Sequence, residues 1–254
     1  MSEPVTMSGH RLAFWERQWR RPDGRGLHIV FEGPEGCGKT TQAKLLASRI
    51  GAVATREPGG TAVGAAIRRI VVDGAEEICA RTEALLMAAD RAQHHAEIVE
   101  PALSCGVPVV SDRGFYSTLA YQHYGRGLDA AELAGISEFA AGGPGRHLPD
   151  VVVMLVVDPA EAHRRRSARA TVDRFENERF EFHRRVFNGF VEMAGRDRYK
   201  WVLVDGVGDP DEVEQRVFDA VAAHPIVRTQ VMPVRLASNG RRPGFATAET
   251  YLAR

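Results

Sequence analysis

The stretch GPEGCGKT at residues 33–40 is the feature that most constrains the fold of this chain. It follows a short apolar run, precedes a helical pattern and satisfies the spacing G-x-x-x-x-G-K-[ST] of a phosphate-binding loop. In such a loop, successive backbone N–H groups and the N-terminus of the next helix hold phosphate oxygens. We therefore expect a P-loop α/β protein that binds a nucleoside triphosphate.

Individual residues of this loop have distinct expected roles. Lys39 is expected to reach the β- and γ-phosphates, and the Thr40 hydroxyl to bind Mg²⁺, whereas Cys37 is interpreted as a small filler. A carboxylate repels phosphate, so Glu35 is expected to face a hydrogen-bond donor such as a sugar hydroxyl; a solvated side chain is an equal alternative. The residues expected to bind ATP are Gly33, Pro34, Glu35, Gly36, Cys37, Gly38, Lys39, Thr40 and Thr41.

Composition argues against several other classes of function. The 254 residues include 33 Lys and Arg against 33 Asp and Glu, so no overall positive charge indicates a nucleic-acid partner. The three cysteines lack metal-ligand spacing, which favours a reduced, cytoplasmic protein. No apolar run approaches the roughly 20 residues of a membrane helix, and the first residues lack the apolar core of a secretory signal.

Short apolar runs rich in Val and Ile alternate with longer helical patterns. Continuous rather than alternating apolarity is typical of strands buried on both faces, as in a parallel sheet. The segments between them are long enough for crossover helices. The predicted strands are residues 27–31, 53–55, 107–110, 151–157 and 201–204.

Two sequences mark helix starts, and they fall within one predicted domain. DPAE at residues 158–161 and DPDE at 209–212 each supply an Asp N-cap, a Pro at the first helical position and a Glu at the third. We expect a single α/β domain over residues 26–225. The flanking segments, residues 1–25 and 226–254, lack sustained periodicity and are expected to be disordered extensions.

Four further motifs carry a resemblance to a known family. Together with the loop, they resemble the thymidylate kinases over roughly residues 26–222. The resemblance implies the nucleoside monophosphate kinase fold with an Arg-rich lid at about 163–176, transfer of the γ-phosphoryl group of ATP to dTMP to give dTDP, and a homodimer. The motifs are TREPGGT at 55–61, LLMAADRAQ at 85–93, VVSDRGFYSTLAYQHYGRGLD at 109–129 and RRRSARATVDRFE at 164–176.

The phosphate-binding arginines follow from chemistry and from this resemblance. An acceptor phosphate, with its second pKa near 6, is already a nucleophilic dianion at neutral pH, so alignment and charge neutralisation matter more than a general base. Arg113 follows the third strand, where its planar fork suits a phosphate; the resemblance gives Arg113 and Arg68 the acceptor phosphate. Asp112 either orders Mg²⁺-bound water or holds Arg113.

The arginine cluster after residue 163 coincides with the lid of the family. A run of cations otherwise indicates a solvated face. By resemblance the lid closes over ATP and delivers a catalytic arginine; Arg169 is the first candidate and Arg165 the second. Arg174 is expected to anchor the lid or the adenine side.

The base pocket is expected around one helix face and the STLAYQ motif. Met87 and Arg91 lie four residues apart and should address the same pocket; by resemblance Arg91 bonds the pyrimidine, while Met87 stands where the family has a stacking Phe. Tyr121 is expected under the sugar, and Glu35 is expected to receive the 3′-OH. The substrate-binding residues expected are Glu35, Arg68, Met87, Arg91, Arg113, Ser117, Thr118, Tyr121 and Gln122.

Two departures from the family pattern keep alternatives open. Met87 replaces the stacking Phe, and Gly114 stands where Tyr or His usually follows the Asp-Arg pair. Both leave room for another acceptor, such as a 5-modified pyrimidine nucleotide. A nucleotide-binding regulator without turnover is a rival of another class, and a P-loop protein acting on nucleic acid is a third.

Overall fold

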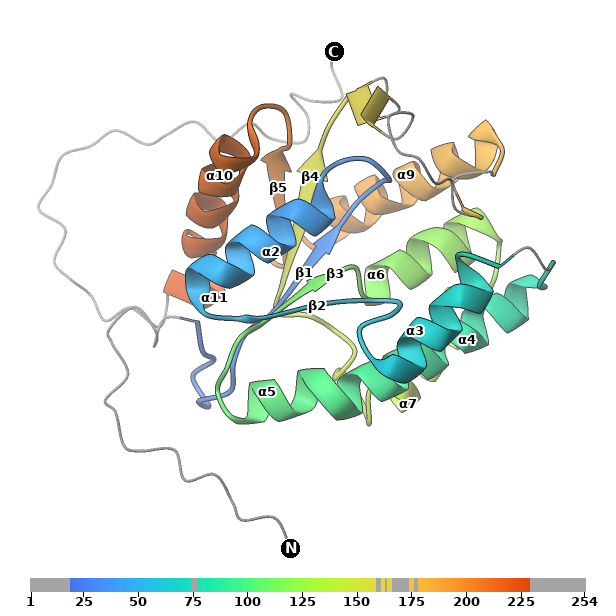
Figure 1. The fold of residues 1–254 in the computed structure, drawn as a ribbon, viewed down its shortest axis with the longest axis horizontal. Helices are drawn as coiled ribbons and strands as arrows, with labels where there is room; N and C mark the ends of the chain where they lie inside the picture. The colour runs from blue at the N-terminus through green and yellow to red at the C-terminus, as the bar shows by residue number, and fades with distance from the viewer. Residues whose placement is uncertain are drawn as a thin grey trace, which may run out of the picture.

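A five-stranded sheet, in which every neighbouring pair is parallel, forms the centre of the computed structural model (Figure 1). The structure describes residues 19–74, 77–158, 161–162, 164–165, 174–175 and 178–228. Its strand order, β2-β3-β1-β4-β5, confirms the predicted α/β class. The strands are β1 (His28–Glu32), β2 (Val53–Arg56), β3 (Val109–Asp112), β4 (Val151–Val156) and β5 (Trp201–Asp205).

The central strands are apolar because both of their faces are covered. All five residues of β1 and the first five of β4 are buried, as expected for strands between two helical layers. The predicted run at 107–110 begins two residues early, because β3 starts at Val109. Pro108 lies just before it, and its carbonyl accepts a hydrogen bond from the N–H of Val53 at 2.9 Å.

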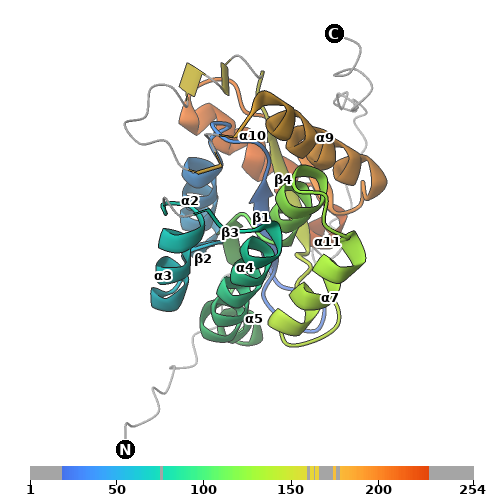
Figure 2. The ribbon, with the colours of Figure 1, turned by 90° about the vertical axis from the view of Figure 1, so that its right-hand side faces the viewer.

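Helices cover both faces of the sheet (Figure 1). α2, α10 and α11 lie on one side, and Figure 2 shows α4, α7 and α9 in front of the other. The α-helices are α2 (Lys39–Ile50), α3 (Ala62–Val71), α4 (Ala80–His94), α5 (Glu100–Ser104), α6 (Phe115–Thr118), α7 (Ala130–Ala140), α9 (Phe180–Arg196), α10 (Pro210–Ala222) and α11 (Pro225–Arg228).

The start of α10 follows its sequence signal. The side chain of Asp209 accepts a hydrogen bond from the N–H of Asp211 at 3.0 Å, and Pro210 occupies the first turn. Val213, Val217 and Val221 of this helix are buried in the core, as their spacing predicts. The start at 158–161 falls partly outside the described residues.

Two π-helical segments were not indicated by any sequence pattern. η1 (His95–Val99) joins α4 to α5, and η2 (Leu119–Gly125) continues α6. η2 packs closely on α9, where a Cβ at Gly125 would lie 2.6 Å from the Phe182 ring. Extra-wide turns of this kind occur often at functional sites.

The body of the fold extends past both expected domain limits. Trp19 is 1 % exposed; its carbonyl accepts a hydrogen bond from the N–H of Leu27 at 3.0 Å, and its ring lies 5.9 Å from that of Phe218. Val227 of α11 is also buried. The expected disorder of residues 1–18 and 229–254 lies outside the described residues. Among the described helices, none is both long and apolar enough to cross a membrane.

Candidate active site

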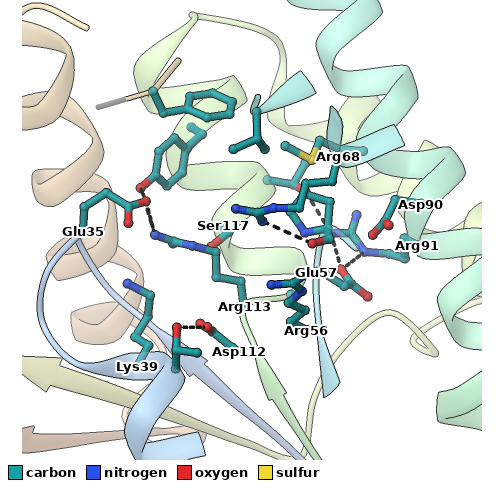
Figure 3. A pocket seen from close by; sticks show the side chains of 18 of the residues that line it. Glu35, Lys39, Arg56, Glu57, Arg68, Asp90, Arg91, Asp112, Arg113 and Ser117 are labelled. Carbon is teal, nitrogen blue, oxygen red and sulfur yellow. Dashed lines mark hydrogen bonds and ion pairs between the residues drawn. The ribbon is translucent and has the colours of Figure 1, made fainter. Parts of the chain in front are cut away.

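One cavity lies at the carboxyl ends of β1, β2 and β3, the edge at which parallel α/β sheets bind ligands. The P-loop after β1 lines it, as do Arg56 to Pro58 at the end of β2 and Asp112 to Gly114 at the end of β3. α4 and η2 close its far end with Arg91 and Gln122. Figure 3 shows Lys39 and Glu35 on the P-loop side, Arg68, Asp90 and Arg91 opposite, and Arg113 between them.

The P-loop takes its shape from its glycines and from Lys39. Gly33, Gly36 and Gly38 have φ of +128°, +80° and +99°, a region in which side chains with a Cβ are strained. The Nζ of Lys39 donates a hydrogen bond to the carbonyl of Pro34 at 2.6 Å. Cys37 is buried in the core, which agrees with its interpretation as a filler.

The far side of the loop carries a hydroxyl and a carboxylate side by side. The Thr40 hydroxyl donates a hydrogen bond to Oδ2 of Asp112, which ends β3. Oδ1 of Asp112 is buried and has no hydrogen-bond partner among the described residues. A buried carboxylate oxygen normally binds a cation or accepts a hydrogen bond, so this position can take such a partner.

Arg113 occupies the middle of the cavity in a strained backbone conformation, with φ of +72°. Its Nη1 donates to the Gly33 carbonyl at 3.2 Å and to the Ser117 hydroxyl at 3.0 Å, and its Nη2 donates to Glu35 and to the Tyr121 hydroxyl. Burial lowers the pKa of Arg113, but Glu35 and the other acidic neighbours raise it further, to well above its ordinary value.

A second carboxylate beneath Arg113 organises the start of α6. Glu32 accepts hydrogen bonds at 3.0 Å from the N–H groups of Gly114 and Ser117, and its other oxygen accepts the Ser117 hydroxyl. Burial raises the pKa of Glu32 to about 7, despite the opposing charge of Arg113.

The far end of the cavity, where the sequence places the base, is built around Arg91. Its guanidinium donates to Glu57 at 3.1 Å, to the Ser137 hydroxyl at 3.0 Å and to the Thr118 hydroxyl at 2.9 Å. Glu57 also bonds Nδ1 of His94 at 2.8 Å. Although burial raises the pKa of Glu57, Arg91 and His94 lower it more, so it lies well below its usual range. Arg91 is thus held rigidly from three elements.

The opposite wall carries the expected Arg68 and two charged residues, Asp90 and Arg56, to which the sequence assigned no role. Asp90 accepts a hydrogen bond from the N–H of Gly59 at 2.9 Å, and burial, reinforced by the charge of Glu57, raises its pKa to about 6. Arg56 and Arg68 also line the cavity, and Nη1 of Arg68 donates to the Pro58 carbonyl at 3.3 Å. Arg56 thus adds a cation to the wall that carries Arg68.

Glu83 connects Gln122 of the cavity wall to Arg126 and Arg174. It is 1 % exposed and accepts hydrogen bonds from Nε2 of Gln122 at 2.8 Å, from Nη2 of Arg126 at 3.1 Å and from Nη2 of Arg174 at 2.5 Å. The N–H of Arg174 also donates to the Val72 carbonyl at 3.0 Å. These bonds agree with the anchoring role expected of Arg174.

Tyr121 closes the cavity near Glu35. Its hydroxyl donates to Glu35 at 2.9 Å, and its ring meets Phe175 edge to face at 5.3 Å. Met87 lines the same cavity. The Glu35 side chain therefore faces hydrogen-bond donors, which agrees with the first of its two interpretations.

Some expected site residues lie elsewhere. Arg165 donates to Glu161 at 2.7 Å and to the Gly206 carbonyl at 3.2 Å and does not line the cavity; Arg169 lies outside the described residues. A Cβ at Gly114 would meet Cγ1 of Val30 at 3.2 Å, so the missing side chain faces Val30, which does not line the cavity.

Sequence reasoning missed Arg56, Glu57, Asp90, Glu83 and Phe175 as parts of this site. The first two stand inside the quoted REPGGT motif and Asp90 inside LLMAADRAQ, so motif membership was an available signal. Phe175 likewise stands inside RRRSARATVDRFE, whereas Glu83 joins the site only through tertiary contacts.

The central strand of the five-stranded parallel sheet ends in a P-loop, and this loop faces an arginine-lined cavity at the carboxyl edge of the sheet. This arrangement defines the class of the P-loop nucleoside monophosphate kinases. The Thymidylate kinase family profile matches residues 31–217. A thymidylate kinase from Synechococcus sp. is 40% identical over 85% of this chain and 100% of its own length. Another, from Carboxydothermus hydrogenoformans, is 43% identical over 74% of this chain and 93% of its own length. The crystal structure of thymidylate kinase from Ehrlichia chaffeensis superposes with a TM-score of 0.62 at 27% identity, over 77% of this chain and 98% of that one. The chain belongs to the thymidylate kinase family.

Proposed function

We propose that this protein phosphorylates dTMP to dTDP with ATP as donor. Family membership supports the reaction, and one observation supports it in this chain: a single cavity joins the P-loop residues Lys39 and Thr40 to Arg113 and to the base-end residues Arg91 and Gln122. A nucleotide seated there has its phosphate at Arg113 and its base against α4 and η2.

The chemistry needs alignment and charge rather than a base. The acceptor phosphate is a dianion at neutral pH, so its oxygen attacks the γ-phosphorus in line as the β–γ bridging bond breaks and ADP leaves. Lys39 stabilises charge on the transferred group, and Arg113 with Arg68 holds the acceptor phosphate. Arg56 and Arg68 both lie against Gly59, where a Cβ would meet each of them within 3.5 Å, and this supports a further phosphate contact by Arg56. Arg165 and Arg169 remain the proposed lid cations.

The remaining substrate contacts follow from the walls of the cavity. Arg91, Thr118 and Gln122 read the base, and Met87 packs on its ring through a polarisable thioether. Tyr121 lies beneath the sugar, and Glu35 receives the 3′-OH. dTMP is the proposed acceptor, and a 5-modified pyrimidine nucleotide is the alternative that Met87 and Gly114 leave open.

The pair formed by Thr40 and Asp112 fits a magnesium ion. Hydroxyl, carboxylate and phosphate oxygens are the ligands that Mg²⁺ prefers, and Oδ1 of Asp112 is buried and unpartnered among the described residues. We propose that Thr40 ligates Mg²⁺ directly and that Asp112 holds its water ligands. When bound, the ion supplies charge neutralisation at the β- and γ-phosphates.

We further propose a homodimer through α4 and its neighbours. Leu85 of α4 is 59% exposed and Phe139 of α7 is 89% exposed, and α4 packs against both α3 and α7. Exposed apolar side chains on adjoining helices are typical of association surfaces. Leu85→Glu should shift the mass measured by light scattering to that of a monomer; an unchanged mass would exclude this face. A cytoplasmic location stays a prediction.

The function is tested by ADP release from MgATP with dTMP, dUMP, 5-hydroxymethyl-dUMP, dCMP, UMP and dGMP in parallel. We expect dTMP to be preferred, and Lys39→Ala to abolish turnover while the circular dichroism spectrum is unchanged. Preference for another pyrimidine would keep the mechanism and change the substrate. ATP binding without turnover on any acceptor would indicate the regulatory alternative.

A further inference from the structure

Among the polar side chains assigned to the base, Gln122 is the one whose hydrogen-bonding role depends on its orientation. Arg91 can only donate hydrogen bonds, and a hydroxyl such as that of Thr118 rotates to suit its partner. The Gln122 amide carries a donor at one end and an acceptor at the other, so the base it prefers depends on which end faces the cavity.

Glu83 decides that orientation. As the ion-pair partner of Arg126 and Arg174, its carboxylate can only accept hydrogen bonds. Gln122 must therefore turn Nε2 toward Glu83, to which it donates at 2.8 Å, and this leaves Oε1 for the cavity that Gln122 lines. Glu83 is 1 % exposed, so water does not compete for the contact.

The resulting pattern matches one pyrimidine edge. Thymine presents a carbonyl at C4 and an N–H at N3, which meet a donor from Arg91 and the acceptor Oε1 of Gln122. Cytosine presents an amino group at C4 and a bare nitrogen at N3, so both contacts become repulsive. A substrate that leaves a buried polar group of the site without its hydrogen-bond partner loses binding free energy, and this discriminates strongly between similar bases.

We propose that Glu83 is a specificity-determining positioning residue, which selects thymine over cytosine by fixing the amide of Gln122. The proposal rests on the proposed dTMP kinase function. Glu83 touches no substrate itself, and it acts through Gln122 from 39 residues away in sequence.

Glu83→Gln tests the proposal with little change in shape. The introduced amide can still accept hydrogen bonds from the arginines, but it can donate as well, so the Gln122 amide is free to flip and present Nε2 to the base. We expect the ratio of kcat/KM for dTMP to that for dCMP to fall by about 10-fold, the effect of one misdirected hydrogen bond. An active variant with an unchanged ratio would overturn the proposal.

Two further variants separate positioning from structure. The swap Glu83→Gln with Gln122→Glu restores an acceptor-only group facing the base, held in place by a donor on α4, and should recover much of the dTMP preference. Arg126→Gln removes the ion pairs of Arg126 with Glu83 and with Glu178 but keeps the contact between Glu83 and Gln122. This variant should leave the ratio unchanged. A swap no better than the single variant, or a ratio lowered equally by Arg126→Gln, would show a general structural role instead.

Equilibrium binding makes this outcome independent of turnover. Calorimetric affinities of dTMP and dCMP are measured for the wild type and for the Glu83→Gln variant in the presence of MgADP. If the wild type fails to phosphorylate dTMP, the proposed function fails, yet the ratio of the two affinities still decides the orienting role of Glu83. The proposal would be overturned by a variant that loses affinity for dTMP and dCMP to the same extent, because the ratio of the two affinities would then be unchanged.

Discussion

Replacing Arg113 with lysine separates the shape of the guanidinium from its charge. Nη1 reaches Gly33 and Ser117 while Nη2 reaches Glu35 and Tyr121, so the two nitrogens work in different directions at once. A lysine brings one nitrogen and one positive charge. It can neutralise Glu35 or meet the acceptor phosphate, but it cannot hold both in the fork geometry.

The size of the effect follows from the hydrogen bonds that a lysine cannot make. A hydrogen bond to a charged group contributes about 1.5–3 kcal/mol, so the absence of one of the two bonds to the acceptor phosphate should lower kcat/KM for dTMP by about 10- to 150-fold. Arg113→Met removes the charge as well and leaves Glu35 without its ion pair, which should abolish turnover and also reduce stability.

The assay is coupled ADP release at subsaturating dTMP, with ATP affinity and the thermal midpoint measured for each variant. Arg69→Lys is the matched control, because Arg69 is an exposed neighbour of Arg68 that does not line the cavity. Activity of Arg113→Lys equal to that of this control would refute the fork argument. A loss of ATP affinity as large as the loss of kcat/KM would refute the assignment of Arg113 to the acceptor.

Three further predictions concern other parts of the site. Burial raises the pKa of Glu32 from 4.5 to about 7, so between these pH values the folded state holds a proton that the unfolded chain releases, and the free energy of unfolding falls as pH rises. Glu32→Gln carries no such proton. Its free energy of unfolding, measured by urea titration, should match that of the wild type near pH 4.5 and exceed it above pH 7 by up to about 3 kcal/mol. Met87→Phe should tighten dTMP binding in calorimetry by stacking, and a weaker affinity would mean that the pocket fits a different base. Thr40→Ala should raise the Mg²⁺ concentration needed for half-maximal turnover, while Ser48→Ala, at an exposed position of the same helix outside the cavity wall, should not.

Local signals predicted the parts of this fold that depend on local chemistry. The P-loop, the buried strands and the N-terminus of α10 each follow from a few adjacent residues, because a glycine turn, an apolar run and an Asp-Pro cap act over one or two turns of chain. Arg113 could be placed for the same reason, since it directly follows a recognisable strand.

The rest of the site depends on residues that are distant in sequence. Glu83 meets Gln122, 39 residues away, and Arg174, 91 residues away, and no periodicity encodes such pairs. The π-helical turn of η2 was also missed, because the 3.6-residue spacing used to recognise helices does not describe a wider turn. The expected boundary at residue 26 left out Trp19, whose burial depends on α10 folding against it.

The pairing of β1 with β3 has a consequence for how the two nucleotides meet. Phe31 is the register partner of Asp112, and the N–H of Arg113 donates to the Phe31 carbonyl at 2.9 Å. The loop that holds one phosphate chain and the arginine assigned to the other thus leave adjacent strands at the same level. Neighbouring strands lie roughly 4.8 Å apart, and a hydrogen-bonded ladder permits little change in that spacing. The sheet thereby serves as a fixed spacer between the proposed donor and acceptor sites, because its hydrogen bonds hold the two loops at one separation.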